Sequence, residues 1–314
     1  MNETIRFLNL TKKFGETIAV DDFTLTVEDT EIMGFLGPNG AGKTTAIMVM
    51  TSVYRPTSGT VEVEGFDVTV MPERVRELLG ICFQDPKFDN RLPVQSVLDW
   101  HAKVAGVPGD QRIKRIEEVL RRIDMWEDRS KRGFTLSGGM SKKVENAKVF
   151  IQRPKIAIFD EPTAFLDVPS RLTIWEMIRE LREEGSTIIL ATNMMDEADR
   201  LSDRVAIMDR GKLVKVGTPS ELKQSIRGGE VLVVRSRRPQ EQVIKEIRQI
   251  PEVVEASYLE GIGVRVYLNQ AGRLLQQILT ILQKHGIEVE NVTISQPTLE
   301  DVFLRYTGRS LDGK

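Results

Sequence analysis

Long hydrophobic runs and cysteine are what this 314-residue sequence has least of. No stretch approaches the roughly 20 apolar residues that cross a bilayer, and the longest candidate, residues 46–54, is broken by Thr51 and Ser52. The N-terminal MNETIRFLNL lacks the basic region and apolar run of a signal peptide. A single cysteine, Cys82, excludes an intrachain disulfide and is typical of a reducing compartment. A role at a membrane would therefore need another chain to supply the span.

An excess of either charge is also lacking. The chain has 44 Lys and Arg against 46 Asp and Glu, interspersed along the sequence, for a formal net charge of −2. A dedicated nucleic-acid surface needs a clustered basic excess, so we expect no nucleic-acid partner. Hydrophobic content of 40% and charged content of 29% are those of a globular protein with an ample core. The length is too great for one average domain and suits two.

Apolar patterns predict an α/β protein with a largely parallel sheet. Phe23, Leu25 and Val27 alternate with threonines as in a half-buried strand. The denser run EIMGFLG, residues 31–37, is typical of a central strand buried on both faces. Residues 94–151 have helical character, with apolar positions at intervals of three and four at Ile113, Ile116, Val119, Leu120 and Ile123. Strand-like and helical runs then alternate, which favours a parallel sheet wrapped by helices.

Residues 226–229 form a predicted domain boundary, because the order of strands and helices changes after them. Strand, helix, strand, strand, helix and strand follow one another from Val231 to Ile294. This βαββαβ order is typical of a ferredoxin-like α+β unit, and TLEDVFLRYTG, residues 298–308, predicts a last helix. We therefore predict a domain at residues 1–226, with a helical subdomain at about 86–151, and an accessory domain at 229–314.

The strongest motif is GPNGAGKTT, which follows a buried strand and opens a helix. Its glycines let successive backbone N–H groups point into one concavity, and the helix N-terminus adds positive potential. Lys43 is then expected at the β- and γ-phosphates of ATP or GTP, and the Thr44 hydroxyl on Mg²⁺. The predicted phosphate-binding loop consists of Gly37, Pro38, Asn39, Gly40, Ala41, Gly42, Lys43, Thr44 and Thr45.

IAIFDEP, residues 156–162, supplies the acids that such a loop needs. An apolar strand delivers Asp160 to its carboxyl end, where a carboxylate can orient Mg²⁺ or its waters. Glu161 follows it and is placed to polarise an attacking water as general base. Adjacent acids after a strand are by themselves usually a helix cap or an exposed loop, but behind a phosphate-binding loop the catalytic interpretation is favoured.

LSGGM, residues 136–140, stands between these motifs and precedes the helical SKKVENAKVF. With the phosphate-binding loop, LSGGM and IAIFDEP in this order, residues 3–225 resemble the ATP-binding-cassette (ABC) family. The resemblance implies a P-loop NTPase cassette with a RecA-like core, an antiparallel β subdomain and a helical subdomain. It also implies two nucleotide domains paired head to tail, with ATP between one subunit's phosphate loop and the other's signature. The signature residues are Ser137, Gly138 and Gly139, at a helix N-terminus that suits an anion.

Three further positions take their roles from the resemblance. Phe14 in TKKFG matches the aromatic that stacks on adenine, with a core strand residue as the alternative. Gln84 in ICFQD matches the glutamine that senses the γ-phosphate and Mg²⁺ and leads into the helical subdomain that contacts the membrane subunit. Asp167 in TAFLD matches the acidic residue of a loop that crosses the dimer interface. In that loop Phe165 is bulkier than the small residue common in the family.

IILATNMMDEAD, residues 188–199, departs from the family. Asn193 stands where the family has a histidine after the strand, directly before the usual helix start, and the chain's two histidines, His101 and His285, lie far from it. An asparagine amide can donate a hydrogen bond to a γ-phosphate, but it cannot titrate near neutral pH. Two interpretations stay open: a tolerated substitution in an active ATPase, or a slow site that pairs with a partner subunit whose site is complete.

The closing PTLEDVFLRYTGRSL resembles the end of drug-resistance-type exporter ATPases, which pair with separate ABC-2-type membrane proteins. The resemblance implies an ATP- and Mg²⁺-dependent ATPase at the cytoplasmic face of the cell membrane. Its partners would be a second ABC ATPase subunit, in a homodimer or heterodimer, and integral membrane permease subunits. An importer ATPase regulated by a ligand on the C-terminal domain is the alternative within transport. A soluble cassette protein of translation or chromosome work fits poorly, since there is one cassette and only about 120 residues separate Lys43 from Glu161.

Overall fold

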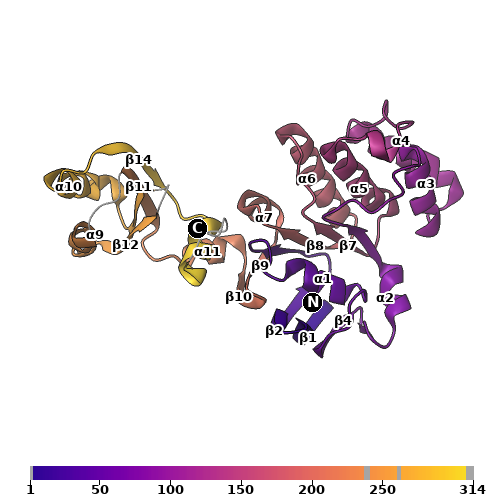
Figure 1. Ribbon diagram of the computed structural model, residues 1–314, viewed down its shortest axis with the longest axis horizontal. Coiled ribbons are helices and arrows are strands. Elements are labelled where there is room, and N and C mark those ends of the chain that lie inside the picture. The colour runs from indigo at the N-terminus through magenta and orange to yellow at the C-terminus, as the bar shows by residue number, and fades with distance from the viewer. Residues whose placement is uncertain (1–2, 237–240, 260–262, 309–314) are drawn as a thin grey trace. The chain divides into compact units, whose positions relative to one another are not determined.

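The computed structural model describes residues 3–236, 241–259 and 263–308. The chain forms two compact units, Met1–Val216 and Gly217–Lys314 (Figure 1). The sequence pattern predicts the domain boundary later in the chain, at residues 226–229, because α8 (Pro219–Gln224) continues the alternation of strands and helices. In the structure α8 begins at a capping box on Thr218 and packs against α11 (Leu299–Thr307), which assigns it to the second unit.

The first unit is centred on a six-stranded sheet whose strands β9, β3, β8, β7 and β6 are parallel. Its spatial order is β10 (Lys212–Gly217), β9 (Arg204–Asp209), β3 (Ile32–Leu36), β8 (Thr187–Thr192), β7 (Ile156–Asp160) and β6 (Leu79–Cys82). Every residue of β3, β7 and β8 is buried, as the dense apolar runs predict for strands covered on both faces. The carboxyl ends of these strands therefore share one edge of the sheet.

A second, antiparallel sheet packs against the first. Its order is β2 (Thr17–Glu28), β1 (Glu3–Phe14), β4 (Ser58–Val63) and β5 (Phe66–Asp67). Phe7 of β1 and Phe23 of β2 meet edge to face with ring centroids 5.2 Å apart, and Phe35 of β3 lies 6.0 Å and 5.8 Å from them. These three buried rings join the two sheets.

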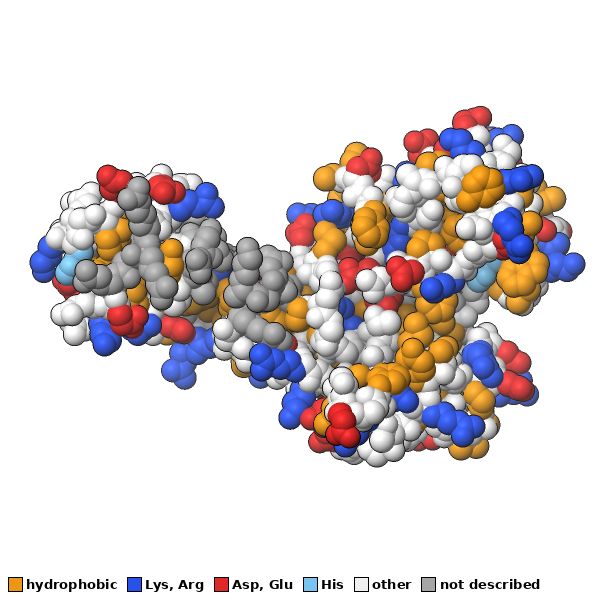
Figure 2. All heavy atoms as spheres, viewed as in Figure 1, with side chains coloured by type: hydrophobic (Ala, Val, Ile, Leu, Met, Phe, Trp, Pro, Cys, Tyr) orange, Lys and Arg blue, Asp and Glu red, His pale blue; other side chains and the backbone are white. Residues whose placement is uncertain are grey.

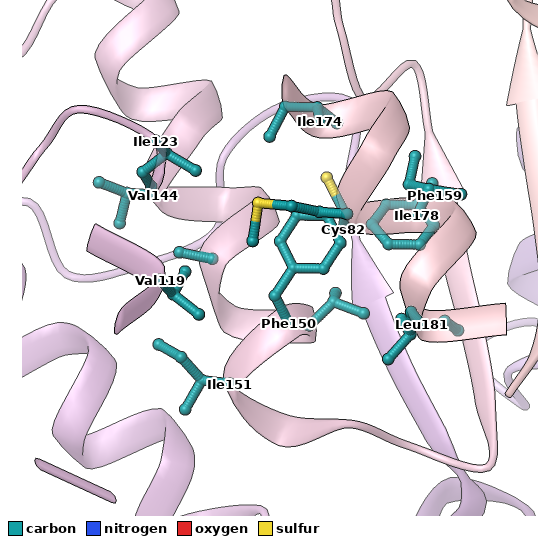
Figure 3. Packing of buried hydrophobic residues seen from close by; sticks show 14 of the residues in the cluster. Cys82, Val119, Ile123, Val144, Phe150, Ile151, Phe159, Ile174, Ile178 and Leu181 are labelled. Carbon is teal, nitrogen blue, oxygen red and sulfur yellow. The ribbon is translucent and has the colours of Figure 1, made fainter. Parts of the chain in front are cut away.

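Helices cover the parallel sheet and build the predicted helical subdomain. They are α1 (Lys43–Met50), α2 (Pro72–Leu78), α3 (Val94–Val104), α4 (Gly109–Arg122), the 3₁₀ turn η1 (Gly133–Thr135), α5 (Gly138–Gln152), α6 (Val168–Glu183) and α7 (Met195–Leu201). Figure 3 shows part of the core to which α5 and α6 contribute, with Phe150 and Phe159 close to Cys82. The ring centroids of Phe150 and Phe159 are 5.5 Å apart. Of the predicted apolar stripe on α4, Ile113 is 70% exposed, whereas Ile116 and Leu120 are buried.

The second unit has the predicted ferredoxin-like order. After α8, its elements are β11 (Glu230–Ser236), α9 (Glu241–Arg248), β12 (Val253–Leu259), β13 (Gly263–Leu268), α10 (Ala271–Lys284), β14 (Val289–Ser295) and α11. The antiparallel sheet runs β12-β13-β11-β14, and α9 and α10 share a hydrophobic core with it. The α+β prediction for this unit is confirmed.

Both units display a mixed charged surface. Figure 2 shows Lys and Arg side chains interspersed with Asp and Glu on the visible face of each unit. In the part of the chain that the structure describes, no helix combines the length and the hydropathy of a membrane span.

Candidate nucleotide site

Three of the predicted motifs meet at the carboxyl edge of the parallel sheet. The phosphate-binding loop follows β3, Glu161 follows β7 and Asn193 follows β8. In the strand register Leu36 pairs with Thr192, and Asp160 pairs with Ala191. Because these parallel strands end level with one another, segments more than 100 residues apart in sequence come together at this edge.

The phosphate-binding loop lines an open cavity of ≈ 420 Å³. The neighbouring strand β2 contributes Thr17, Ile18 and Ala19 to the same cavity, which the sequence analysis did not anticipate. The residues that the motifs predicted and that line it are Asn39, Gly40, Ala41, Gly42, Lys43, Thr44, Thr45, Gln84 and Glu161. The cavity thus brings the loop together with Gln84 and Glu161.

Two glycines of the loop have no room for a side chain. Gly42 has a φ of +103°, and a Cβ there would lie 2.5 Å from the carbonyl oxygen of Ala19. A Cβ on Gly37 would lie 2.3 Å from the carbonyl oxygen of Met208. The loop therefore needs glycine at these positions for backbone conformation and for close approach to its neighbours.

Lys43 is buried at the centre of the loop. Its Nζ donates to the carbonyl oxygens of Gly37, at 2.7 Å, and Pro38, at 3.2 Å, and lies 3.9 Å from Glu161 Oε1. Burial lowers the pKa of Lys43, and the nearby carboxylates of Glu161 and Asp160 oppose that shift. A desolvated ammonium in this position interacts strongly with a phosphate, because little water screens it.

The Thr44–Asp160 pair has the donor set of a magnesium site. Thr44 Oγ1 donates to Asp160 Oδ2 at 2.8 Å. The other carboxylate oxygen, Asp160 Oδ1, is buried without a hydrogen-bond partner among the described residues. Burial raises the pKa of Asp160, while the hydrogen bond from Thr44 and the charge of Lys43 act against that rise. An unsatisfied buried carboxylate oxygen beside a hydroxyl fits a hard cation that prefers oxygen ligands.

Glu161 is held in a backbone conformation that is rare for a residue with a side chain. Its φ is +53°, and its N–H donates to the carbonyl oxygen of Ala191 at 2.8 Å. Such a conformation costs of order 1–3 kcal/mol and persists where the surroundings impose it, commonly at functional sites. Burial raises the pKa of the Glu161 carboxyl, and the charge of Lys43 partly offsets the effect. A raised pKa brings a carboxylate closer to the value that suits a general base near neutral pH.

Asn193 lies beside the phosphate-binding loop. Its side chain is half-buried, and its Nδ2 donates to Asn39 Oδ1 at 3.4 Å, a long hydrogen bond. The Asn193 amide is therefore held weakly against the loop.

Phe14 lies at the end of β1 and does not line this cavity. Phe14 is 45% exposed, which contradicts the alternative of a core strand residue. Tyr54 meets it edge to face with centroids 5.3 Å apart, and Lys12 Nζ lies 4.8 Å from its centroid. The exposed ring is thus held by two neighbours that the sequence analysis missed.

The signature and Asp167 do not line the cavity of their own chain. Ser137 caps α5, where its Oγ accepts from the Met140 N–H at 3.2 Å, and both Ser137 and Gly138 are exposed. Asp167 caps α6, and hydrogen bonding from Ser170 lowers its pKa. Within its own chain Asp167 therefore acts as a helix cap.

Comparison with known proteins identifies the family. Residues 20–164 match the family model described as ABC transporter, and residues 217–307 match that of the ATP-binding protein DrrA1-3-like C-terminal domain. The daunorubicin resistance ATP-binding protein DrrA2 of Streptomyces coeruleorubidus is 33% identical over 97% of this chain and 95% of its own length. The chain belongs to the ABC transporter ATP-binding subunits. As a member of this family it is an ATPase that binds ATP with a divalent metal.

Other relatives of this ABC subunit support the same family assignment. The linearmycin resistance ATP-binding protein LnrL of Bacillus subtilis (strain 168) is 28% identical over 96% of this chain and 98% of its own length. A solved ATP-binding subunit of an ABC transporter matches 71% of this chain and 92% of its own, with a TM-score of 0.67 and 24% identity. A dimeric ATP-binding cassette in a post-hydrolysis state, bound to ADP and Pi, matches 68% of this chain and 98% of its own. Its TM-score is 0.64 and its sequence identity is 23%. These structures confirm the predicted cassette fold.

Helix α5 of this ABC subunit carries charged residues that no motif marked. Lys142, Glu145 and Lys148 follow the signature at intervals of three residues, which places them on one face of the helix. All three are buried, whereas charged residues on a helix normally face solvent. These charged residues recur every three residues beside the apolar positions of the same helix, and this spacing was the sequence signal that could have indicated their burial.

Proposed function

We propose that two such subunits close on two ATP molecules and that hydrolysis reopens them, driving an export channel formed by separate integral membrane permease subunits. The observation that carries the proposal is the convergence of Lys43, the Thr44–Asp160 pair and Glu161 at one edge of the sheet. The resistance functions in the names of DrrA2 and LnrL support a toxic small molecule as the exported class.

In this mechanism the chain contributes mainly positioning and charge. Lys43 places its ammonium against the β- and γ-phosphates, and Thr44, Asp160 and Gln84 would hold Mg²⁺. When bound, Mg²⁺ neutralises negative charge on the phosphate oxygens. Glu161 accepts the proton of the attacking water, and its position 3.9 Å from the Lys43 ammonium keeps the carboxylate aligned.

The remaining predicted residues act on the nucleotide from its other sides. Asn193 donates its amide to the γ-phosphate, and Phe14 offers its exposed ring to adenine. The other subunit supplies Ser137, Gly138 and Gly139, since the exposed N-terminus of α5 presents N–H groups to an anion. Asp167 lies in the loop proposed to cross the dimer interface, beside Phe165, which is 84% exposed.

The proposed location is the cytoplasmic face of the cell membrane, where the permease subunits hold this chain. An importer ATPase with a ligand on the second unit stays the alternative, and direct ligand binding to that unit would favour it. Affinity purification from native membranes tests the choice of partner. Recovery of a membrane permease is the expected result, and recovery of soluble partners only, such as ribosomes, would contradict export.

The Glu161→Gln variant tests the catalytic assignment. The amide keeps the shape of the side chain but cannot accept a proton, so steady-state ATP turnover should fall by about 100-fold or more. ATP binding, measured with a fluorescent ATP analogue, should persist. Glu183→Gln makes the same chemical change at an exposed position of α6 and serves as the matched control. Turnover of Glu161→Gln equal to that of the control would remove Glu161 from the mechanism.

A further inference from the structure

Helix α5 carries three buried charges that the proposed mechanism leaves without a role. Lys142, Glu145 and Lys148 are 1%, 0% and 5% exposed. A buried charge is costly unless it is paired and hydrogen-bonded. The groups that satisfy these side chains therefore indicate which part of the molecule they serve.

Lys142 connects the carboxyl ends of two strands. Its Nζ donates to the carbonyl oxygens of Phe83 at 2.8 Å, Gln84 at 3.1 Å and Asp160 at 3.0 Å. An ammonium has three N–H groups, and these three carbonyls use all of them. Gln84 follows β6 and Asp160 ends β7, so a single side chain holds the backbone of both proposed metal ligands.

Glu145 and Lys148 hold the same segment one and two turns further along α5. Glu145 accepts from the N–H of Phe83 at 3.3 Å and from the N–H of Lys87 at 2.9 Å. Lys148 Nζ lies 2.7 Å from Glu145 Oε1 and donates to the carbonyl oxygen of Lys87 at 3.1 Å. Residues 83–87 are therefore fixed at both ends by α5.

We propose that Lys142 is a positioning residue for the metal side of the nucleotide site, fixing the backbone of Gln84 relative to that of Asp160 so that both side chains reach one cation. The inference rests on the proposed assignment of Gln84 and Asp160 to Mg²⁺. Because α5 begins at the signature, Lys142 also links Ser137 and Gly138, assigned to the other subunit's ATP, to the metal ligands of its own chain.

Lys142→Met tests the inference, because it removes the three hydrogen bonds while keeping an unbranched side chain. The Mg²⁺ concentration that gives half-maximal binding of a fluorescent ATP analogue should rise about ten-fold, and turnover at limiting Mg²⁺ should fall by a similar factor. Analogue binding without Mg²⁺ should stay unchanged. The backbone amides of Phe83 and Lys87 should exchange with deuterium faster, which reports on the segment independently of activity.

The matched control is Lys143→Met, the same change one residue along α5, where the side chain is only half-buried. Lys142→Arg keeps the charge and several donors and should recover part of the Mg²⁺ response. If Lys142→Met does not fold, Glu145→Gln replaces it, with the same direction expected for Mg²⁺ and for the Phe83 and Lys87 amides. A Mg²⁺ dependence equal to that of the control in the folded variant would overturn the inference.

Asp160→Asn separates this inference from the proposed function. If Asp160→Asn loses the Mg²⁺ response while Lys142→Met retains it, the metal site stands and the role of Lys142 is wrong. If Asp160→Asn responds to Mg²⁺ like the unmodified chain, the assignment of the metal ligands itself is wrong.

Discussion

Asn193 touches the phosphate-binding loop through one long hydrogen bond, between its Nδ2 and Asn39 Oδ1 at 3.4 Å. A histidine at this position could donate a hydrogen bond to the γ-phosphate and, once protonated, add positive charge. The asparagine amide supplies the first contribution only. We therefore expect a change at position 193 to alter turnover more than nucleotide affinity, because affinity depends on the whole loop.

We predict that Asn193→His raises the steady-state ATPase activity of the purified subunit and leaves its ATP affinity nearly unchanged. The gain should be about ten-fold at most, the value of one charged hydrogen bond that strengthens in the transition state. Turnover and analogue binding measured on the same preparation check it, with Asn291→His at an exposed position of β14 as control. Unchanged or lower turnover in a dimer that still closes would favour the tolerated substitution.

The sequence predicted most of the residues that line the cavity of the phosphate-binding loop, because these residues belong to local motifs. Glycines that need a positive φ, a lysine at the helix start and acids after an apolar strand recur at fixed spacing. Lys142 could not be assigned in this way. Its partners are backbone carbonyls at residues 83, 84 and 160, and any residue type can supply a carbonyl, so no motif marks the contact.

Helix α11 shows how one element of the second unit is fixed to its sheet. Asp301 forms a capping box with Thr298 at the start of the helix. The same carboxylate accepts from Tyr267 Oη at 2.9 Å and pairs with Arg265 at 3.0 Å, and both partners lie on β13. Burial, followed by the charge of Asp301, raises the pKa of Tyr267, so its hydroxyl stays a donor.

We predict that Asp301→Asn destabilises the second unit by about 3–5 kcal/mol, because it leaves the buried Arg265 without its counter-charge. Urea unfolding of the full chain, with amide exchange on α11 and β13, measures the loss. Glu300→Gln, the adjacent position on α11, is the control, and ATP binding should be unaffected in both variants. Loss of less than 1 kcal/mol would show that apolar contacts alone hold the helix.

The order of elements in the second unit was predictable from periodicity, but its starting point was not. A helix after a strand is what the first unit repeats, so α8 looks in sequence like one more member of that series. Its assignment depends on packing against α11, more than 70 residues later in the chain. Local patterns thus give element types and order, whereas membership of a compact unit depends on contacts distant in sequence.

At the scale of the whole molecule, the proposed function requires two subunits to make one complete site. Ser137 and Gly138 are exposed at the start of α5, and neither lines the cavity formed by the phosphate-binding loop of the same chain. If the signature is needed for turnover, as we propose, it acts on ATP held by another copy or by a related subunit. The two halves of the proposed site can then be inactivated on different chains.

We predict that Ser137→Arg abolishes turnover and leaves ATP binding intact, whereas Lys43→Ala abolishes turnover and weakens binding. If the subunit forms a homodimer, an equal mixture of the two variants should recover about a quarter of the unmodified activity, because half of the dimers are mixed and each mixed dimer contains one intact composite site. Turnover of the mixture against each variant alone measures this, with cross-linking to count mixed dimers. Mixed dimers without recovered turnover would contradict a site shared between subunits. An unmodified chain inactive by itself but active with a related ATPase subunit would instead identify a heterodimer, in which Asn193 belongs to the slower of two unequal sites.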